Sequence, residues 1–90
     1  MLIFPLKKEW YEKIKSGEKT IEYREVKPYW SKRLNQDCMF PWNCKLRLGY
    51  TKKYMTAKIT RIEVVDGKDT DLHIGKPVYA IHLADVREEE

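Results

Sequence analysis

The alternation of apolar and polar positions along the chain predicts five strands. In most of them the apolar residues recur at every second position, as one buried face of a sheet requires. In the longest, the apolar parity changes near Thr60 and Arg61, which indicates a β-bulge of the kind that helps a sheet to curl. Pro5 has no amide proton to donate, so the first strand is expected at a sheet edge. The expected strands cover residues 2–6, 19–26, 45–50, 55–65 and 77–86.

Two short helices are expected between these strands. Residues 7–16 place Trp10 and Ile14 four positions apart on an apolar stripe, which is typical of a helix with one buried face. Gly17 is expected to end this helix in a left-handed conformation. A second helix is expected over residues 28–34, with a proline in its first turn. The strand residues that we expect in the core are Leu46, Leu48, Tyr50, Tyr79, Ile81 and Leu83.

Length and element order predict one small domain. We place it at residues 1–86 and treat residues 87–90 as an acidic C-terminal tail. The elements predict an α+β chain, mainly β, in which a small closed sheet carries a helix over one opening. A monomer is the favoured expectation, and the sequence leaves the oligomeric state open.

Positive charge is concentrated in the middle of the chain. The net charge is +4, and residues 27–61 contain nine basic side chains against one acid, Asp37. Such a region attracts polyanions, RNA among them; the alternative is that lysines on strand edges only deter aggregation. Aromatic residues share this region, and unpaired bases stack on such rings unless the rings fill the core. We expect Tyr29 and Trp30 to be the exposed rings, beside Lys32 and Arg33 on a short helix, and count all four as candidate RNA-binding residues.

Neither a membrane span nor a metal site is expected. No apolar run approaches the ~20 residues of a membrane helix, so a cytoplasmic protein without membrane contact is predicted. Cys38 and Cys44 lack the second pair of a zinc ribbon and are expected to be structural or incidental thiols. His73 and His82 fit no metal-ligand spacing; His73 lies in a polar loop with Asp71, from which it could reach a cleft. With no P-loop or dinucleotide fingerprint, we expect no cofactor.

Residues 17–24 carry an unusual concentration of charge for the start of a strand. Lys19, Glu22 and Arg24 alternate with apolar residues, so that Glu22 and Arg24 fall on one face of the expected strand. One interpretation is an ordinary surface ion pair, worth ~0–1 kcal/mol. The other is that the three charges meet one another, or a ligand, in a cleft. In either case Gly17 leaves backbone N–H groups of the turn exposed beside Lys19, where an anion could bind.

These residues reproduce the GxKxxExR pattern of the ASCH domain family, a relative of the PUA domain. Gly17, Lys19, Glu22 and Arg24 match the pattern, which lies between the first helix and the second strand. The resemblance extends to neighbouring residues on both sides and is closest to the small stand-alone proteins of bacteria and phages. It implies a PUA-like β-barrel of five to six strands, with one or two short helices covering a cleft.

The resemblance implies an RNA- or nucleotide-binding protein that uses a Lys/Glu/Arg cleft. The alternative is an enzyme, either a ribonuclease or a hydrolase of modified nucleosides similar to the N4-acetylcytidine amidohydrolases. In that branch a lysine activates a threonine two residues before the arginine. Lys19 and Arg24 match, but Glu22 stands in the threonine's place and Thr20 lies elsewhere on the strand, so a carboxylate would have to replace a hydroxyl nucleophile.

The candidate site follows from the pattern and the basic region together. If the chain is an enzyme, Lys19, Glu22 and Arg24 are the candidate catalytic residues, with Glu22 as a general base. The candidate ligand- or RNA-binding residues are Gly17, Lys19, Thr20, Glu22, Arg24, Tyr29, Trp30, Lys32 and Arg33.

Overall fold

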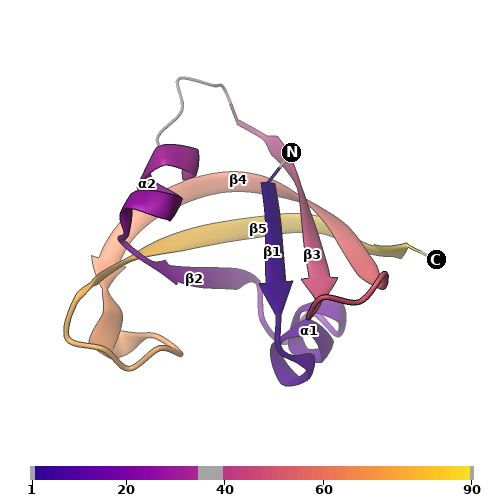
Figure 1. Cartoon of the computed structure of the whole chain (residues 1–90), viewed down its shortest axis with the longest axis horizontal. Coiled ribbons are helices and arrows are strands. Elements are labelled where there is room, and N and C mark those ends of the chain that lie inside the picture. Colours follow the sequence, from indigo (N-terminus) through magenta and orange to yellow (C-terminus); the bar gives the residue numbers. More distant parts are fainter. Residues whose placement is uncertain (1, 35–39, 90) are drawn as a thin grey trace.

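The computed structural model describes residues 2–34 and 40–89. They form five strands, two short α-helices and one turn of 3₁₀ helix (Figure 1). The chain is therefore mainly β, as expected. Its elements are β1 (Leu2–Leu6), α1 (Lys8–Lys15), β2 (Ile21–Glu25), α2 (Pro28–Leu34), β3 (Trp42–Leu48), β4 (Tyr54–Asp66), η1 (Gly67–Asp69) and β5 (Pro77–Glu89).

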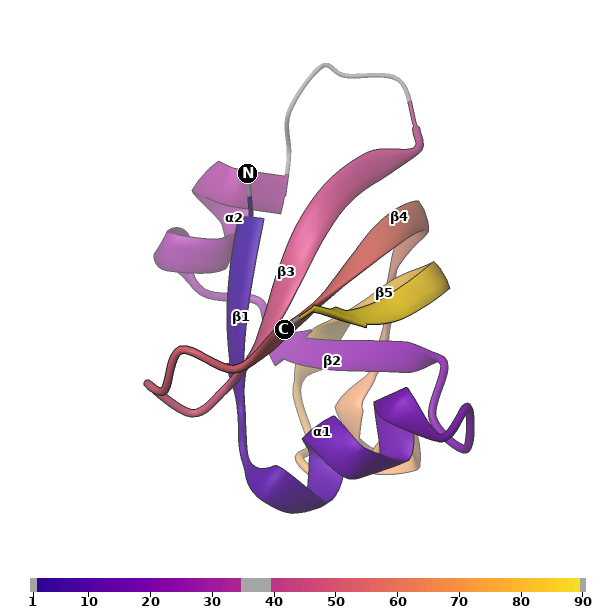
Figure 2. The same ribbon diagram turned by 90° about the vertical axis from the view of Figure 1, so that its right-hand side faces the viewer.

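The five strands form one curled sheet in the order β1-β3-β4-β5-β2. β1 runs parallel to β3, and every other neighbouring pair is antiparallel. The ladder between β4 and β5 shifts register between Thr56 and Lys58 and again between Ile59 and Arg61, so the expected bulge is confirmed and a second one precedes it. These irregularities lie in the two longest strands, which bend into a half-barrel (Figures 1 and 2).

The sheet is curled but not closed by a ladder. β1 and β2 lie at its two ends, and no backbone pairing joins them in the described part of the chain. The expectation that β1 is an edge strand is confirmed, whereas the closed sheet is not. We call the line between β1 and β2 the seam.

The core fills the concave side of this sheet. Alternate residues of β3, β4 and β5 point inward, and the expected positions Leu46, Tyr79, Ile81 and Leu83 are all buried. Tyr50 was expected there, but it is 91% exposed because β3 ends at Leu48 and the chain turns at the following residues. The fully buried side chains are Phe4, Tyr11, Ile14, Cys44, Leu46, Met55, Ile59, Val78 and Ile81.

Helix α1 covers one end of the half-barrel (Figure 2). Its Tyr11 and Ile14 are buried, and the Tyr11 hydroxyl donates a hydrogen bond of 3.0 Å to Glu88 of β5. Gly17 follows the helix with φ +85°, which confirms the expected left-handed stop. β5 was expected to end at Val86, but it continues to Glu89 because its last residues pair with the start of β4. The acidic side chains of residues 88 and 89 therefore belong to the sheet.

Helix α2 lies beside the other end of β1, and Trp30 stacks on Phe4 with a ring-centroid distance of 5.0 Å. Residues 35–39, which include Cys38, lie outside the described ranges. Cys44 is buried in β3, and burial raises the pKa of its thiol to about 12, which fits the expected structural role. Over residues 2–34 and 40–89, neither helix has the length and apolarity needed to cross a membrane.

Candidate functional site

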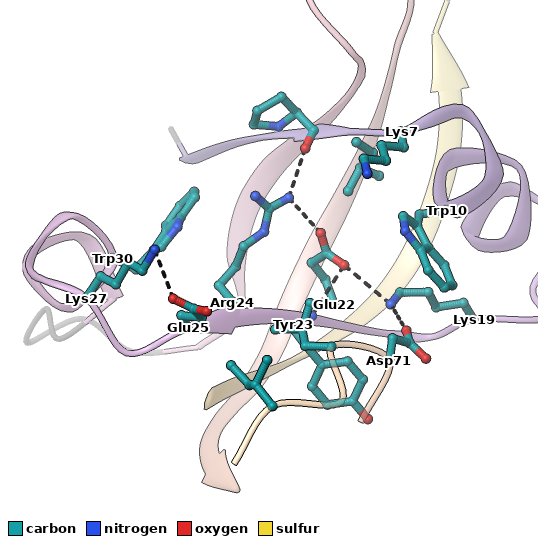
Figure 3. Close-up of a pocket in the computed structure, with 14 residues that line it drawn as sticks. Lys7, Trp10, Lys19, Glu22, Tyr23, Arg24, Glu25, Lys27, Trp30 and Asp71 are labelled. Carbon is teal, nitrogen blue, oxygen red and sulfur yellow. Dashed lines mark hydrogen bonds and ion pairs between the residues drawn. The ribbon is translucent and has the colours of Figure 1, made fainter. Parts of the chain in front are cut away.

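A pocket of about 430 Å³ lies over the seam between β1 and β2 (Figure 3). Its walls come from both strands, from α1 and α2, and from residues 71–74 of the loop before β5. Trp10 of α1 and Trp30 of α2 stand at opposite ends, and Lys19, Glu22 and Arg24 lie between them (Figure 3). We call this cavity the seam pocket.

Glu22 occupies the centre of the seam pocket because of its register in β2. It lies opposite Ile81, and Arg24 lies opposite Tyr79, so both charged side chains share the face that packs against the core. Glu22 is only 5% exposed. A buried carboxylate is stable only when hydrogen bonds and opposite charges replace its water. The interpretation of Glu22 and Arg24 as an ordinary surface ion pair is therefore wrong, because the pair is largely buried.

The Glu22 carboxylate accepts two hydrogen bonds and forms an ion pair with Lys19. Arg24 Nη2 lies 2.7 Å from Oε2, and Lys19 Nζ lies 3.4 Å from Oε1. The backbone N–H of Tyr23 also donates to Oε1, at 3.3 Å. Both oxygens are thus engaged in holding the two cations in place.

Arg24 links the two ends of the sheet. Besides its pairing with Glu22, its Nη2 donates a hydrogen bond of 2.9 Å to the carbonyl oxygen of Pro5 in β1. The guanidinium carbon lies 5.4 Å and 5.1 Å from the ring centroids of Phe4 and Trp30. A side chain thus crosses the seam where a backbone ladder is missing.

Lys19 is held between two acids and two rings. Its ammonium group pairs with Asp71 of the loop before β5 as well as with Glu22. It also lies 4.9 Å from the ring centroid of Trp10 and 5.2 Å from that of Tyr23, within cation–π range. The Lys19 side chain is only 10% exposed, so most of its charge is already satisfied within the protein.

The seam pocket as a whole is nearly charge-balanced. Four basic side chains and three acidic ones line it, which leaves a single positive charge. Lys27 pairs with Glu25 at 2.9 Å, so among the described lining residues only Lys7 is basic and has no carboxylate within 4.0 Å. None of the described lining residues is a serine, threonine or cysteine. The pocket therefore presents aromatic rings and polar groups, and most of its charged side chains are already paired with one another.

The structure brings together four of the nine candidate binding residues. Lys19, Glu22, Arg24 and Trp30 line the seam pocket. Thr20 instead borders an adjoining hollow on the far side of Lys19 and Asp71. Trp30, expected to be exposed, is half-buried against β1. The candidates that do not line the pocket are Gly17, Thr20, Tyr29, Lys32 and Arg33.

On the outer side of α2, Tyr29 is 55% exposed, as expected, and the Arg33 guanidinium lies 3.6 Å from its ring centroid. Lys32 is exposed on the same helix. The Tyr29 ring packs edge-on against Trp30, with a ring-centroid distance of 4.8 Å, but Tyr29, Lys32 and Arg33 do not line the seam pocket.

Sequence reasoning missed several pocket residues. Trp10 was assigned to the core stripe of α1, although it is a partly exposed pocket wall. Asp71 comes from a polar loop that carries no periodic signal, and the neighbouring His73 does not line the pocket. His82 does not line the pocket either, and its Nε2 lies 2.7 Å from Oε2 of Glu63.

Comparisons of the chain with protein-family models, with curated proteins and with solved structures returned no match. Among the described residues there is also no cluster of three His, Cys, Asp or Glu side chains that could hold a metal ion. The site is therefore interpreted from its own geometry.

Proposed function

We propose that this chain is an RNA-binding module of the ASCH type, with a PUA-like barrel, and that the seam pocket receives one unpaired nucleotide. The observation that carries the proposal is the arrangement of Trp10 and Trp30 at the two ends of a pocket whose centre is the buried Lys19–Glu22–Arg24 group.

The dimensions and the chemistry of the pocket suit a nucleobase. Its volume of about 430 Å³ falls within the ~300–1,000 Å³ typical of small-ligand sites. Indole rings offer flat surfaces for stacking, at ~1–3 kcal/mol per base. Cationic donors and a carboxylate lie close together, and a base edge presents donors and acceptors at similar spacing. Because the charges compensate one another, the site is stable before any ligand arrives.

Binding is favoured over hydrolysis because none of the described lining residues is a serine, threonine or cysteine. An amidohydrolase of the resembled branch needs a hydroxyl beside its lysine, but Thr20 lies outside the seam pocket. For a ribonuclease, Glu22 would have to take a proton, yet both of its oxygens already accept hydrogen bonds from the protein. Glu22 is therefore assigned a positioning role.

Fluorescence anisotropy with a labelled single-stranded RNA of about ten nucleotides tests the proposal, since single-strand sites span ~4–16 nucleotides. We expect saturable binding, weaker binding of the same RNA as a duplex, and loss of affinity in Trp10→Ala. The loss is about 5- to 150-fold if one stacked base is worth ~1–3 kcal/mol. Tyr50→Ala is the matched control, because that ring is 91% exposed and is not among the residues that line the pocket.

Two results would overturn the proposal. One is the absence of binding to the RNA and to all four nucleoside monophosphates. The other is release of cytidine from N4-acetylcytidine, or RNA cleavage, that disappears in Lys19→Ala, since either would establish an enzyme rather than a binding module.

A further inference from the structure

The outer face of the sheet carries a group of cations that form no ion pair with a described carboxylate. Lys45 and Arg47 alternate with buried residues of β3 and so point away from the core, and Arg87 lies on the same face of β5. None of the three has a carboxylate within 4.0 Å among the described residues. We call them the outer cations.

The strand register places these side chains in one region. Lys45 lies opposite Thr56, which lies opposite Arg87, so a single row crosses β3, β4 and β5. Arg47 lies opposite Tyr54 in the next row. Neighbouring strands are ~4.8 Å apart, so the row spans about 10 Å from β3 to β5.

Polar and aromatic groups complete this surface. The Lys45 ammonium lies 4.7 Å from the Tyr54 ring centroid. A hollow of about 360 Å³ adjoins the row, with Thr56, Lys58 and Arg87 in its lining. Two acids share the face: Asp85 lies 3.9 Å from Lys58, and Glu89 accepts a hydrogen bond from Thr56. Four cations against two acids leave the face positive.

The outer cations are separated from the seam pocket by one strand. Pro5 of β1 lines the pocket and lies opposite Arg47, and Ile3 lies opposite Lys45. A chain leaving the pocket over β1 therefore reaches β3 directly.

On the opposite side of the pocket, the row of residues across β2 carries charges that are paired with one another. Across β2, Ile21 lies opposite His82, which lies opposite Arg61. Glu63 pairs there with Arg61 at 3.0 Å and with His82 at 2.7 Å. That cluster is self-compensated, so it attracts a polyanion less than the outer cations do.

We propose that Lys45, Arg47 and Arg87 bind the phosphodiester backbone of the single-stranded RNA whose nucleotide enters the seam pocket. The inference rests on the proposed function and assigns the base and the phosphates of the RNA to two different surfaces. The pocket, whose cations are already paired, takes the base, and the outer cations take the phosphates. Phosphate contacts of this kind are independent of base sequence and depend strongly on salt.

The test compares two ligands and two double variants. Lys45→Ala/Arg87→Ala removes two cations from the row. Lys8→Ala/Lys68→Ala removes the same net charge at exposed positions outside both the seam pocket and the outer face. Each protein is titrated with the RNA of about ten nucleotides by anisotropy, and with a nucleoside monophosphate by tryptophan fluorescence, over a range of NaCl concentrations.

Each phosphate contact to a single strand contributes about −0.7 to the slope of log affinity against log salt concentration. For Lys45→Ala/Arg87→Ala, called the outer-face variant, this slope is therefore expected to be shallower by about 1.4. At 0.1 M salt the corresponding loss of RNA affinity is roughly 25-fold. Nucleoside monophosphate affinity is expected to stay unchanged, and so is RNA binding by the control. Lys45→Arg/Arg87→Lys, which keeps both charges, is expected to retain most of the affinity, while Lys45→Gln/Arg87→Gln repeats the loss if the alanine variant fails to fold.

The outcomes separate this inference from the proposed function. If the monophosphate and the RNA both bind but the outer-face variant matches the control in affinity and salt slope, the outer cations are not the phosphate site and the pocket proposal stands. If the outer-face variant and the control lose equal affinity, the effect is one of net charge and the inference fails. If neither ligand binds to the unaltered protein, both proposals fail.

Discussion

Replacement of Glu22 by glutamine is the sharpest test of how the seam is held together. The change keeps the size and one acceptor oxygen but removes the charge that pairs with Arg24 and Lys19. Removing one member of a buried ion pair costs about 3–5 kcal/mol. Arg24 remains 19% exposed and keeps its hydrogen bond to Pro5, so we expect a smaller loss, about 2–3 kcal/mol in the free energy of unfolding.

For a domain of this size, 1 kcal/mol shifts the melting temperature by about 4–8 °C, so Glu22→Gln is expected to melt roughly 10–20 °C lower. Urea unfolding followed by circular dichroism measures the free energy directly. Glu25→Gln is the matched control, because Glu25 lies on the same strand but pairs with Lys27 at the surface, where an ion pair is worth ~0–1 kcal/mol.

A double-mutant cycle with Arg24→Gln then isolates the pair. Groups in direct contact couple by ~0.5–3 kcal/mol, and we expect a value in the upper half of that range. The reasoning is refuted if Glu22→Gln and Glu25→Gln have equal stability, or if the effects of the Glu22 and Arg24 substitutions simply add.

Three further predictions concern the scaffold. Gly67→Ala is expected to destabilise the fold by at least ~2 kcal/mol in thermal unfolding, because a Cβ there would lie 2.5 Å from a backbone carbonyl oxygen; Gly75→Ala, which meets nothing within 4 Å, serves as control and should stay within ~0.5 kcal/mol. Burial and Glu88 raise the pKa of Tyr11 to about 12, so the stability that this hydroxyl contributes is complete below pH 10 and is lost as the pH rises toward 12. Tyr11→Phe should flatten that decline, and an unchanged pH profile would contradict the assignment. Cys44 is expected to resist iodoacetamide at pH 8 in the native protein and to react in urea, as peptide mass spectrometry can determine; native labelling would show that the thiol is not buried.

The elements were predictable because their signals are local. Helix α2 covers the expected residues 28–34, and each expected strand overlaps an observed one. Tyr50 was misplaced because alternation alone does not reveal where a strand stops, and here the chain turns after Leu48. The end of β5 was placed too early because its last residues are mostly acidic, which is typical of a tail. These residues nevertheless extend the strand, because they pair with the first residues of β4.

The centre of the seam pocket could be predicted, but its walls could not. Lys19, Glu22 and Arg24 come from one short segment, so a spacing pattern was enough to group them. Asp71 reaches Lys19 from 52 residues away, through a loop without periodicity. Trp10 lies on an apolar stripe whether it faces the core or the pocket, and only the docking of α1 decides between them.

The open seam bears on how the proposed nucleotide would reach the pocket. In the part of the chain that the structure describes, the Arg24 side chain of β2 reaches β1 through its hydrogen bond to Pro5 and its approach to the Phe4 ring, and no ladder joins the two strands. Exposed side chains change rotamer within nanoseconds, whereas local unfolding takes microseconds to seconds. If the pocket binds a nucleotide as proposed, movement of the partly exposed Trp10, Trp30 and Arg24 side chains would open it without breaking any ladder of the half-barrel sheet.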